Sequence, residues 1–265
     1  MTANEARNLA LPHVHTKYVA FVDNDVSVTP GWLTTLLACA EDTDAWAVGP
    51  LYLIGDPAKQ IIHMAGAELK IVEDHGSRFL HERHRFSNLP LAQVRAQLVR
   101  EPTDLIEFHC MLVRKDVLDR FGPLDEQLRS VLDHVDFCLA IAGAGGSIFI
   151  EPAAIVTHLA PPPYALYDLP YFFLRFSDAW LEPSVRRFAE KHGLAFSDAE
   201  FDGHRRFRSV HRLRLLRRTR GAIRRLFGKS ALALADNFTN MFFDRVVEPV
   251  VAGPMERRRR LDPRR

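Results

Sequence analysis

The sequence predicts an α/β protein with a Rossmann-like mixed sheet flanked by helices, followed by a helical C-terminal extension. In the first 160 residues, short apolar and β-branched segments alternate with segments of helical spacing. After the triple proline at 161–163 the chain becomes rich in aromatic residues and then in arginine, again with helical spacing. We therefore expect an α/β domain at residues 1–165 and a helical, Arg-rich region at residues 166–265.

Composition supports a globular chain. The 265 residues are 47% hydrophobic and carry 35 Lys+Arg against 33 Asp+Glu, which is enough apolar material for a core. Three cysteines without a C-x-x-C pair do not support a disulfide framework or a zinc ribbon. No run of 18 apolar residues and no export signal is visible, so we expect a cytoplasmic protein.

The first half of the α/β domain contains two predicted strands and one predicted helix before a long polar stretch. The pattern predicts strands at Tyr18–Val22 and Trp46–Leu53, and a helix over Trp32–Ala40 that starts after Thr29 as N-cap. Residues 66–72 are expected to form half of a β-ribbon. Residues 73–100 are expected to form a loop that ends in a helix at 91–98.

The second half continues the alternation. Strands are expected at 105–113, 147–150 and 154–157, with helices at 115–121 and 133–142, the latter stopped by the glycine run at 143–146. Beyond residue 165 we expect helix over 166–200 and one or two further helices over 205–248.

Two carboxylates, Asp23 and Asp25, directly follow the first predicted strand. Open α/β sheets bind ligands outside the carboxyl ends of their strands, and hard oxygen ligands there suit Mg²⁺ or Mn²⁺ beside a diphosphate. The D-x-D pattern alone is uninformative, because a second copy, Asp42-Thr43-Asp44, follows a helix and suits a solvated turn. Only the buried strand before Asp23 distinguishes the first copy.

A second group of polar residues opens the predicted helix at 133–142. Asp133 and Asp136 are three apart and share one helix face, with His134 between them, an imidazole able to titrate near neutral pH. The simple alternative is a solvated face. Separately, His158 ends the last predicted strand, where a structural role and a metal role are both open. The other histidines, including His63, His75, His81, His84 and His109, look too dispersed to define a site.

Five segments in order resemble family 2 glycosyltransferases of the GT-A fold. They are R-N-L-A-L from Arg7, Y-V-A-F-V-D-N-D from Tyr18, F-H-C-M-L-V-R-K from Phe108, D-H-V-D-F-C-L from Asp133, and P-A-A-I-V-T-H from Pro152. The resemblance covers about residues 3–160 and implies a GT-A-like domain. It implies a divalent metal, Mn²⁺ or Mg²⁺, on Asp23, Asp25 and His158, which would bind the donor diphosphate.

The resemblance also places other residues. It implies that Arg7, Asn8 and Asp23 lie near the nucleotide, and that the segment 121–126 leads to the acceptor side. The family's general base usually lies in a Glu-Asp-x-Asp pattern, which here reads Asp133-His134-Val135-Asp136, so Asp133, His134 and Asp136 all remain candidates.

One departure from the family pattern concerns the start of the chain. Members usually begin with a strand, a helix and a second strand ending in Asp, which bind the base, whereas here Met1 lies only a few residues before Arg7. Either the start is truncated, or another element replaces this half-site, or donor binding has been lost.

Residues 204–229 form a basic block with eleven Lys/Arg and no Asp or Glu. Its apolar residues fall near one helical face, which suits a helix lying on an anionic membrane surface or one packed on the catalytic domain. Nucleic-acid binding is not expected, because aromatic residues do not alternate with the arginines as single-strand binders need.

The resemblance implies an inverting, metal-dependent glycosyltransferase. We expect it to move a sugar from a nucleotide-sugar, UDP-linked by default, to a carbohydrate or lipid-linked acceptor, with a role in cell-envelope polysaccharide. It would be cytoplasmic, with peripheral binding to the inner membrane face through 204–229 as an open addition. The alternatives are a non-catalytic scaffold of the same fold and a module that only binds a membrane surface.

Overall fold

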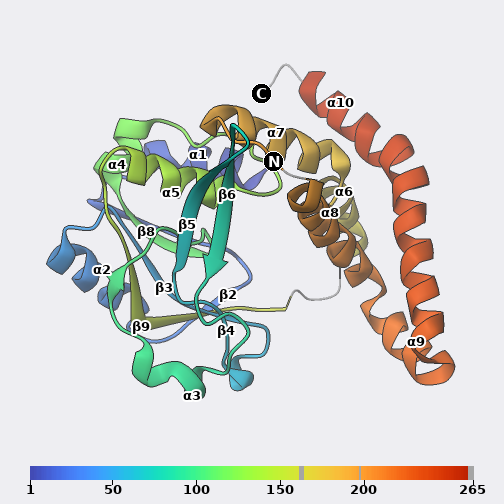
Figure 1. Cartoon of the computed structure of the whole chain (residues 1–265), viewed down its shortest axis with the longest axis horizontal. Helices are drawn as coiled ribbons and strands as arrows, with labels where there is room; N and C mark the ends of the chain where they lie inside the picture. The colour runs from blue at the N-terminus through green and yellow to red at the C-terminus, as the bar shows by residue number, and fades with distance from the viewer. Residues whose placement is uncertain (161–163, 197, 262–265) are drawn as a thin grey trace. The chain divides into compact units, whose positions relative to one another are not determined.

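The computed structural model describes residues 1–160, 164–196 and 198–261 (Figure 1). The chain divides into two compact units. Unit 1 comprises residues 1–126 and 132–161, and unit 2 comprises residues 127–131 and 162–265.

Unit 1 contains a seven-stranded sheet with neighbour order β1-β8-β3-β9-β2, to which β4 adds beside β3 and β7 beside β9. Strands β3 and β9 run parallel, and the other pairs are antiparallel. The strands are β1 (Tyr18–Val22), β2 (Val26–Val28), β3 (Ala47–Ile54), β4 (Ile61–Met64), β7 (Glu101–Pro102), β8 (Cys110–Arg114) and β9 (Ile148–His158).

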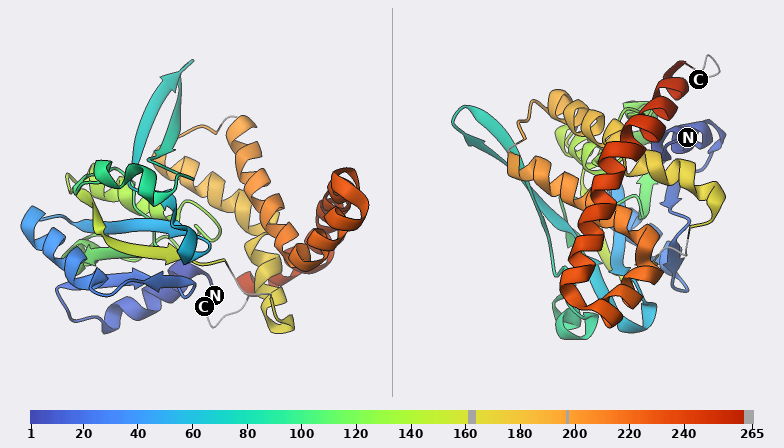
Figure 2. Two further views of the ribbon diagram at one scale, coloured as in Figure 1. Left: turned by 90° about the horizontal axis from the view of Figure 1, so that it is seen from below. Right: turned by 90° about the vertical axis from the view of Figure 1, so that its right-hand side faces the viewer.

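The helices of unit 1 are short, and all of them except α1 lie between these strands in the sequence. They are α1 (Ala3–Ala10), α2 (Trp32–Thr43), α3 (Leu91–Val94), α4 (Lys115–Phe121) and α5 (Asp133–Gly143), with 3-10 turns at Leu11–His13, Pro57–Lys59 and Arg95–Gln97. Both α2 and α5 pack against β9. A separate hairpin of β5 (Ala67–Asp74) and β6 (Ser77–His84) projects from the main sheet (Figure 2).

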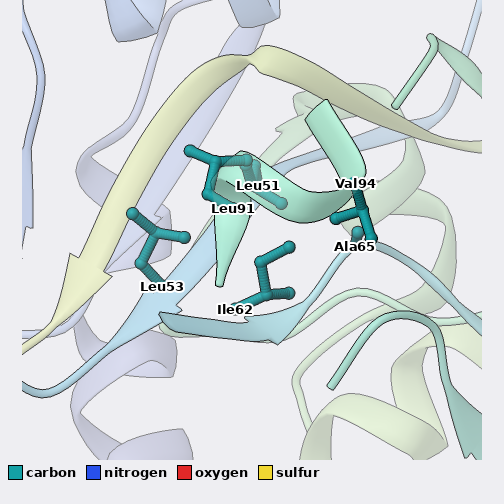
Figure 3. Close-up of a cluster of buried hydrophobic side chains, with 6 residues drawn as sticks. All are labelled: Leu51, Leu53, Ile62, Ala65, Leu91 and Val94. Atoms are coloured by element: carbon teal, nitrogen blue, oxygen red, sulfur yellow. The ribbon is translucent and has the colours of Figure 1, made fainter. Parts of the chain in front are cut away.

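The core of unit 1 centres on β3, which is buried along seven of its eight residues. On one side, Leu51 and Leu53 pack with side chains of β4 and α3 (Figure 3), the cluster being Leu51, Leu53, Ile62, Ala65, Leu91 and Val94. A strand buried in this way holds its neighbours β4, β8 and β9 in fixed register, and the register places the strand ends that carry the candidate site.

Unit 2 is helical. Its elements are α6 (Leu169–Arg175), α7 (Asp178–His192), α8 (Asp198–Arg212), α9 (Arg217–Phe242), a π-helical segment η6 (Phe243–Ala252) and α10 (Gly253–Leu261), with 3-10 turns at Leu166–Asp168 and Leu213–Leu216. Helix α9 is kinked at Gly228, whose φ is 81°. Among the described helices, none combines the length and the apolar character that crossing a bilayer requires.

A buried arginine organises unit 2. Arg212 is 0% exposed and uses all three guanidinium nitrogens: Nε donates to the carbonyl of Phe176 at 2.8 Å, Nη1 pairs with Asp244 at 2.5 Å, and Nη2 pairs with Glu248. Arg208, also buried, pairs with Asp178 and Asp244. Two of the eleven basic residues expected on a solvent- or lipid-facing block are therefore internal, because acidic side chains from α7 and η6 neutralise them.

The predicted fold class is confirmed: a mixed sheet with helices packed on it and a helical C-terminal region. Several predicted elements differ in extent. The expected loop at 73–90 is partly wrong, because residues 77–84 complete the hairpin as β6, whose mixed charged sequence on both faces hides the strand period. The helix expected at 91–98 ends at Val94 and continues as a 3-10 turn.

Three further local expectations are corrected. The strand expected at 105–113 begins only at Cys110, because the N–H of Glu107 bonds the Tyr52 hydroxyl instead of a neighbouring strand. The two short strands expected at 147–150 and 154–157 are one strand, β9, with a register shift beside Pro50. Helix α2 starts from Gly31 at φ 78° rather than from Thr29, and α1 was not expected at all.

Candidate active site

The first element of the site is a carboxylate–imidazole pair. Strand β2 pairs with the end of β9, with Val26 opposite His158. This register brings His158 Nε2 to 3.1 Å from Asp25 Oδ2, although the two residues are 133 apart in sequence. The hydrogen bond to His158 holds the pKa of the Asp25 carboxyl below its usual value, so this carboxylate stays ionised at neutral pH.

A second pair lies beside the first. Strands β1 and β8 pair with Val22 opposite Cys110, so the next residues outward are Asp23 and His109. His109 Nδ1 lies 2.9 Å from Asp23 Oδ2. The His109 ring stacks on that of His158, with centroids 4.1 Å apart. Burial alone would lower the pKa of His109, but the bond to Asp23 and the charge of Glu107 raise it overall.

Arg7 joins the strand ends to the start of α5. Its Nη1 donates to Asp133 Oδ2 at 2.7 Å, its Nη2 lies 3.4 Å from Asp23 Oδ1, and its guanidinium sits 4.0 Å over the Phe108 ring. The guanidinium therefore holds two candidate site carboxylates at once.

Helix α5 begins under local strain. Leu132, its N-cap, has φ 70°, a left-handed conformation that costs a leucine about 1–3 kcal/mol. The strained turn orients the first helical residues, Asp133 and His134. Asp136, one turn further, is buried at 6% exposure.

The electrostatics distinguish Asp133 from His134, two of the three candidate bases. Burial by itself would raise the pKa of Asp133, but its contacts with His134 and Arg7 hold that pKa well below the usual range. For His134, burial alone lowers the pKa, yet the bond to Asp133 and the charges of Glu107 and Glu82 outweigh it and raise the pKa to about 9. His134 therefore carries a proton at neutral pH, whereas Asp133 is ionised.

The side chain of Asn8 makes its hydrogen bonds to the turn that contains Leu124 and Glu126. Its side-chain amide donates to the Leu124 carbonyl and to Glu126 Oε1, each at 2.9 Å, and its oxygen accepts from the Leu124 N–H at 2.8 Å. The structure thus ties Asn8 to the segment predicted to lead to the acceptor. Its contact with a nucleotide stays a prediction, as does that of Arg7.

Histidines that look dispersed in the sequence gather in unit 1, so that expectation is wrong for three of them. His63 of β4 bonds Glu107 Oε1 through Nε2 at 3.0 Å, His84 ends β6 beside the carboxylate of Glu82, and His109 Nε2 lies 3.6 Å from Glu107 Oε2. His75 and His81 stay on the exposed hairpin. One signal was available: Glu107 interrupts an apolar run, and a carboxylate there needs partners.

The Asp25–His158 pair has the chemistry to hold a divalent cation. It offers one carboxylate oxygen and one imidazole nitrogen on partly exposed side chains, which leaves room for substrate oxygens or water. The predicted third ligand is less free, because both Asp23 oxygens contact cationic or imidazole nitrogens. Within the described residues, the three-ligand set that lies within 4.8 Å is His63, His84 and Glu107.

The sequence comparisons with known proteins both find glycosyltransferases. Residues 3–122 match the model of glycosyl transferase family 2. The chain is 29% identical over 154 residues to the pre-mycofactocin glycosyltransferase from two strains of Mycobacterium tuberculosis, a match that covers 58% of this chain. The chain spans 29% of the length of these relatives.

Two solved structures are also similar. The crystal structure of GalNAc-T7 with UDP, GalNAc and Mn²⁺ matches 85% of this chain and 44% of its own, at 14% identity and a TM-score of 0.45. The UTP-bound UGPase from Acinetobacter baumannii matches 58% of this chain and 50% of its own, at 11% identity and a TM-score of 0.30. Both scores lie below 0.5, so neither structure adds to the assignment.

Proposed function

We propose that this chain, whose residues 3–122 match the model of glycosyl transferase family 2, transfers a sugar from a nucleotide-sugar, UDP-linked by default, to a carbohydrate or lipid-linked acceptor. The observation that carries the proposal is the Asp25–His158 pair, 3.1 Å apart at the ends of adjacent strand segments. This pair sits where an α/β sheet receives a phosphorylated ligand.

In this proposal the Asp25–His158 pair stabilises the leaving group through a bound cation. Asp25 and His158 would hold Mn²⁺ or Mg²⁺, which when bound neutralises charge on the departing nucleoside diphosphate. Asp25 suits this role because it stays ionised, and Asp23 shapes the site by fixing His109 and Arg7.

The opposite side of the site would activate the acceptor. A single displacement that inverts the anomeric carbon needs a base to take the proton of the attacking hydroxyl. Protonated His134 cannot accept it. Of the two carboxylates, Asp133 is the more accessible and is oriented by Arg7, so we assign the base to Asp133 and a packing role to Asp136.

The direct test is sugar transfer by the purified full chain with UDP-sugars and Mn²⁺. Asp25→Asn should reduce turnover by roughly 100-fold or more, since stabilisation of the leaving group is a large electrostatic contribution. Asp44→Asn, from the second D-x-D, is the matched control and should leave turnover unchanged, because the Asp44 side chain is 90% exposed. Undiminished turnover in Asp25→Asn, with the fold intact by circular dichroism, would overturn the proposal.

A non-catalytic scaffold is the second candidate. It is favoured by His134, an imidazole within the segment in which the family usually carries the base carboxylate. Calorimetry with UDP and Mn²⁺ separates the two. Heat of binding together with transfer supports the enzyme, whereas a fold that gives neither supports the scaffold.

We extend the proposal to location. A cytoplasmic protein is supported by three cysteines that are all free and buried, Cys39, Cys110 and Cys138. Contact with an anionic inner membrane face is supported by exposed apolar side chains beside the basic residues of α9, including Leu226 and Phe227. Arg224→Glu with Arg225→Glu in the full chain should abolish co-flotation with anionic vesicles, and unchanged flotation would remove the membrane from the proposal.

A further inference from the structure

We propose that His63, His84 and Glu107 form a second metal site, specific for a transition-metal ion such as Zn²⁺, that fastens the foot of the β5–β6 hairpin to the main sheet. The site is independent of the proposed transfer reaction. One ligand atom from each residue lies within 4.8 Å of the other two.

The three ligands come from three separate parts of unit 1. His63 lies in β4, His84 is the last residue of β6, and Glu107 lies in the loop before β8. In the hairpin register His84 pairs with Ala67, at the end of the hairpin where it joins the sheet. An ion bound here would therefore link the hairpin to two segments of the sheet.

The carboxylate of Glu107 is an independent indication of a ligand. Glu107 is only 6% exposed, and its Oε2 has no hydrogen-bond partner among the described residues, the nitrogen of His109 lying 3.6 Å away. A buried, ionised oxygen without a hydrogen bond is costly. A cation bonded to this oxygen would remove that cost.

Further hydrogen bonds orient the ligand residues, as is usual at metal sites. The Tyr52 hydroxyl accepts from the Glu107 N–H at 3.1 Å and donates to the Cys110 carbonyl at 2.7 Å, which fixes the backbone that carries the carboxylate. The His84 imidazole contacts the carboxylate of Glu82. Carboxylate partners of this kind orient ligating imidazoles.

The ligand set selects the class of ion. Two imidazole nitrogens and one carboxylate suit Zn²⁺, with Mn²⁺ and Co²⁺ weaker, whereas Mg²⁺ and Ca²⁺ prefer a shell made of oxygens. An ion bound by these three residues would neutralise the charge of Glu107 without using Asp25 or His158, so the two candidate metal sites can be tested separately.

The experiment titrates Zn²⁺ into the chelator-stripped full chain carrying Asp25→Asn, which removes the other candidate site. We expect one tight equivalent by calorimetry and a rise in Tm. Adding His84→Gln should weaken binding roughly 100-fold or more and abolish the rise in Tm, because a ligand is lost. Adding His81→Gln, an exposed histidine of the same strand, should change neither.

Binding that is equal in the His84→Gln and His81→Gln chains would overturn the site, as would the absence of a tight equivalent in the parent. If His84→Gln fails to fold, His63→Gln and Glu107→Gln give the same comparison. The outcome does not depend on transfer activity: a chain without turnover that still binds Zn²⁺ through His84 supports this site and counts against the proposed function alone.

Discussion

The two units both bury charge but use it differently. In unit 2, Arg212 is fully buried and every guanidinium nitrogen has a partner, so the group is a closed structural network. In unit 1, histidines and carboxylates meet at strand ends, and Glu107 keeps one oxygen without a hydrogen bond among the described residues. A buried charge by itself therefore says little about function. The feature that marks the candidate site is an incompletely paired carboxylate beside several imidazoles, because a buried atom without a hydrogen bond also occurs in unit 2, at Arg208 Nε.

Replacing Arg212 should give the largest effect on stability. Arg212→Met removes the counter-ion of Glu248, whose side chain is 14% exposed, and one of the two arginine partners of the half-exposed Asp244, and breaking a buried ion pair costs about 3–5 kcal/mol. Urea unfolding followed by circular dichroism measures the change. Arg224→Met, at an exposed arginine of α9, is the control and should change the free energy of unfolding by less than about 0.5 kcal/mol. Equal losses in the two variants would show that Arg212 is not a structural centre.

A smaller loss is expected from Tyr52→Phe in unit 1. The change leaves the Glu107 N–H and the Cys110 carbonyl without the Tyr52 hydroxyl in a fully buried position, which costs about 1–3 kcal/mol. If the proposed metal site exists, this variant should also weaken Zn²⁺ binding about 10-fold, because the carboxylate loses its backbone support. A variant as stable as the parent would mean that the loop before β8 is held by other contacts.

The third expected effect, similar in size to that of Tyr52→Phe, is a dependence of stability on alkaline pH. The pKa of His134 is raised from 6.5 to about 9 in the folded chain, so the stabilising charge is fully present below pH 6.5 and is lost as the pH rises through 9. We expect the free energy of unfolding to fall by about 1–3 kcal/mol between pH 6.5 and pH 9.5. His134→Gln should flatten this part of the curve, whereas His81→Gln should not. The prediction fails if the parent and His134→Gln lose stability equally over this range.

The sequence was most informative where one short segment determined the outcome. The strand Tyr18–Val22 and the two carboxylates after it were readable because a compact apolar run ends in charge. Helix α5 was readable from its spacing and its glycine stop. The α/β class followed from such segments, and the family resemblance follows the same residues.

The rest depended on pairings that no local pattern encodes. His63, His84 and Glu107 come together only through the register of β4, the register of the hairpin and the path of the loop before β8. In addition, the charged residues of β6 obscure its strand pattern in the sequence. Likewise, Arg208 and Arg212 resemble their basic neighbours until the fold supplies Asp178, Asp244 and Glu248. The residues were visible in the sequence, but their partners were not.

The stacked rings of His109 and His158 have a consequence for substitutions at the strand ends. Their contact, with ring centroids 4.1 Å apart, packs the imidazole that bonds Asp23 against the imidazole that bonds Asp25. Removing either ring takes away a packing surface of the other, so a substitution at one position should disturb both carboxylate pairs. The effects of His109 and His158 variants should therefore be non-additive when they are combined.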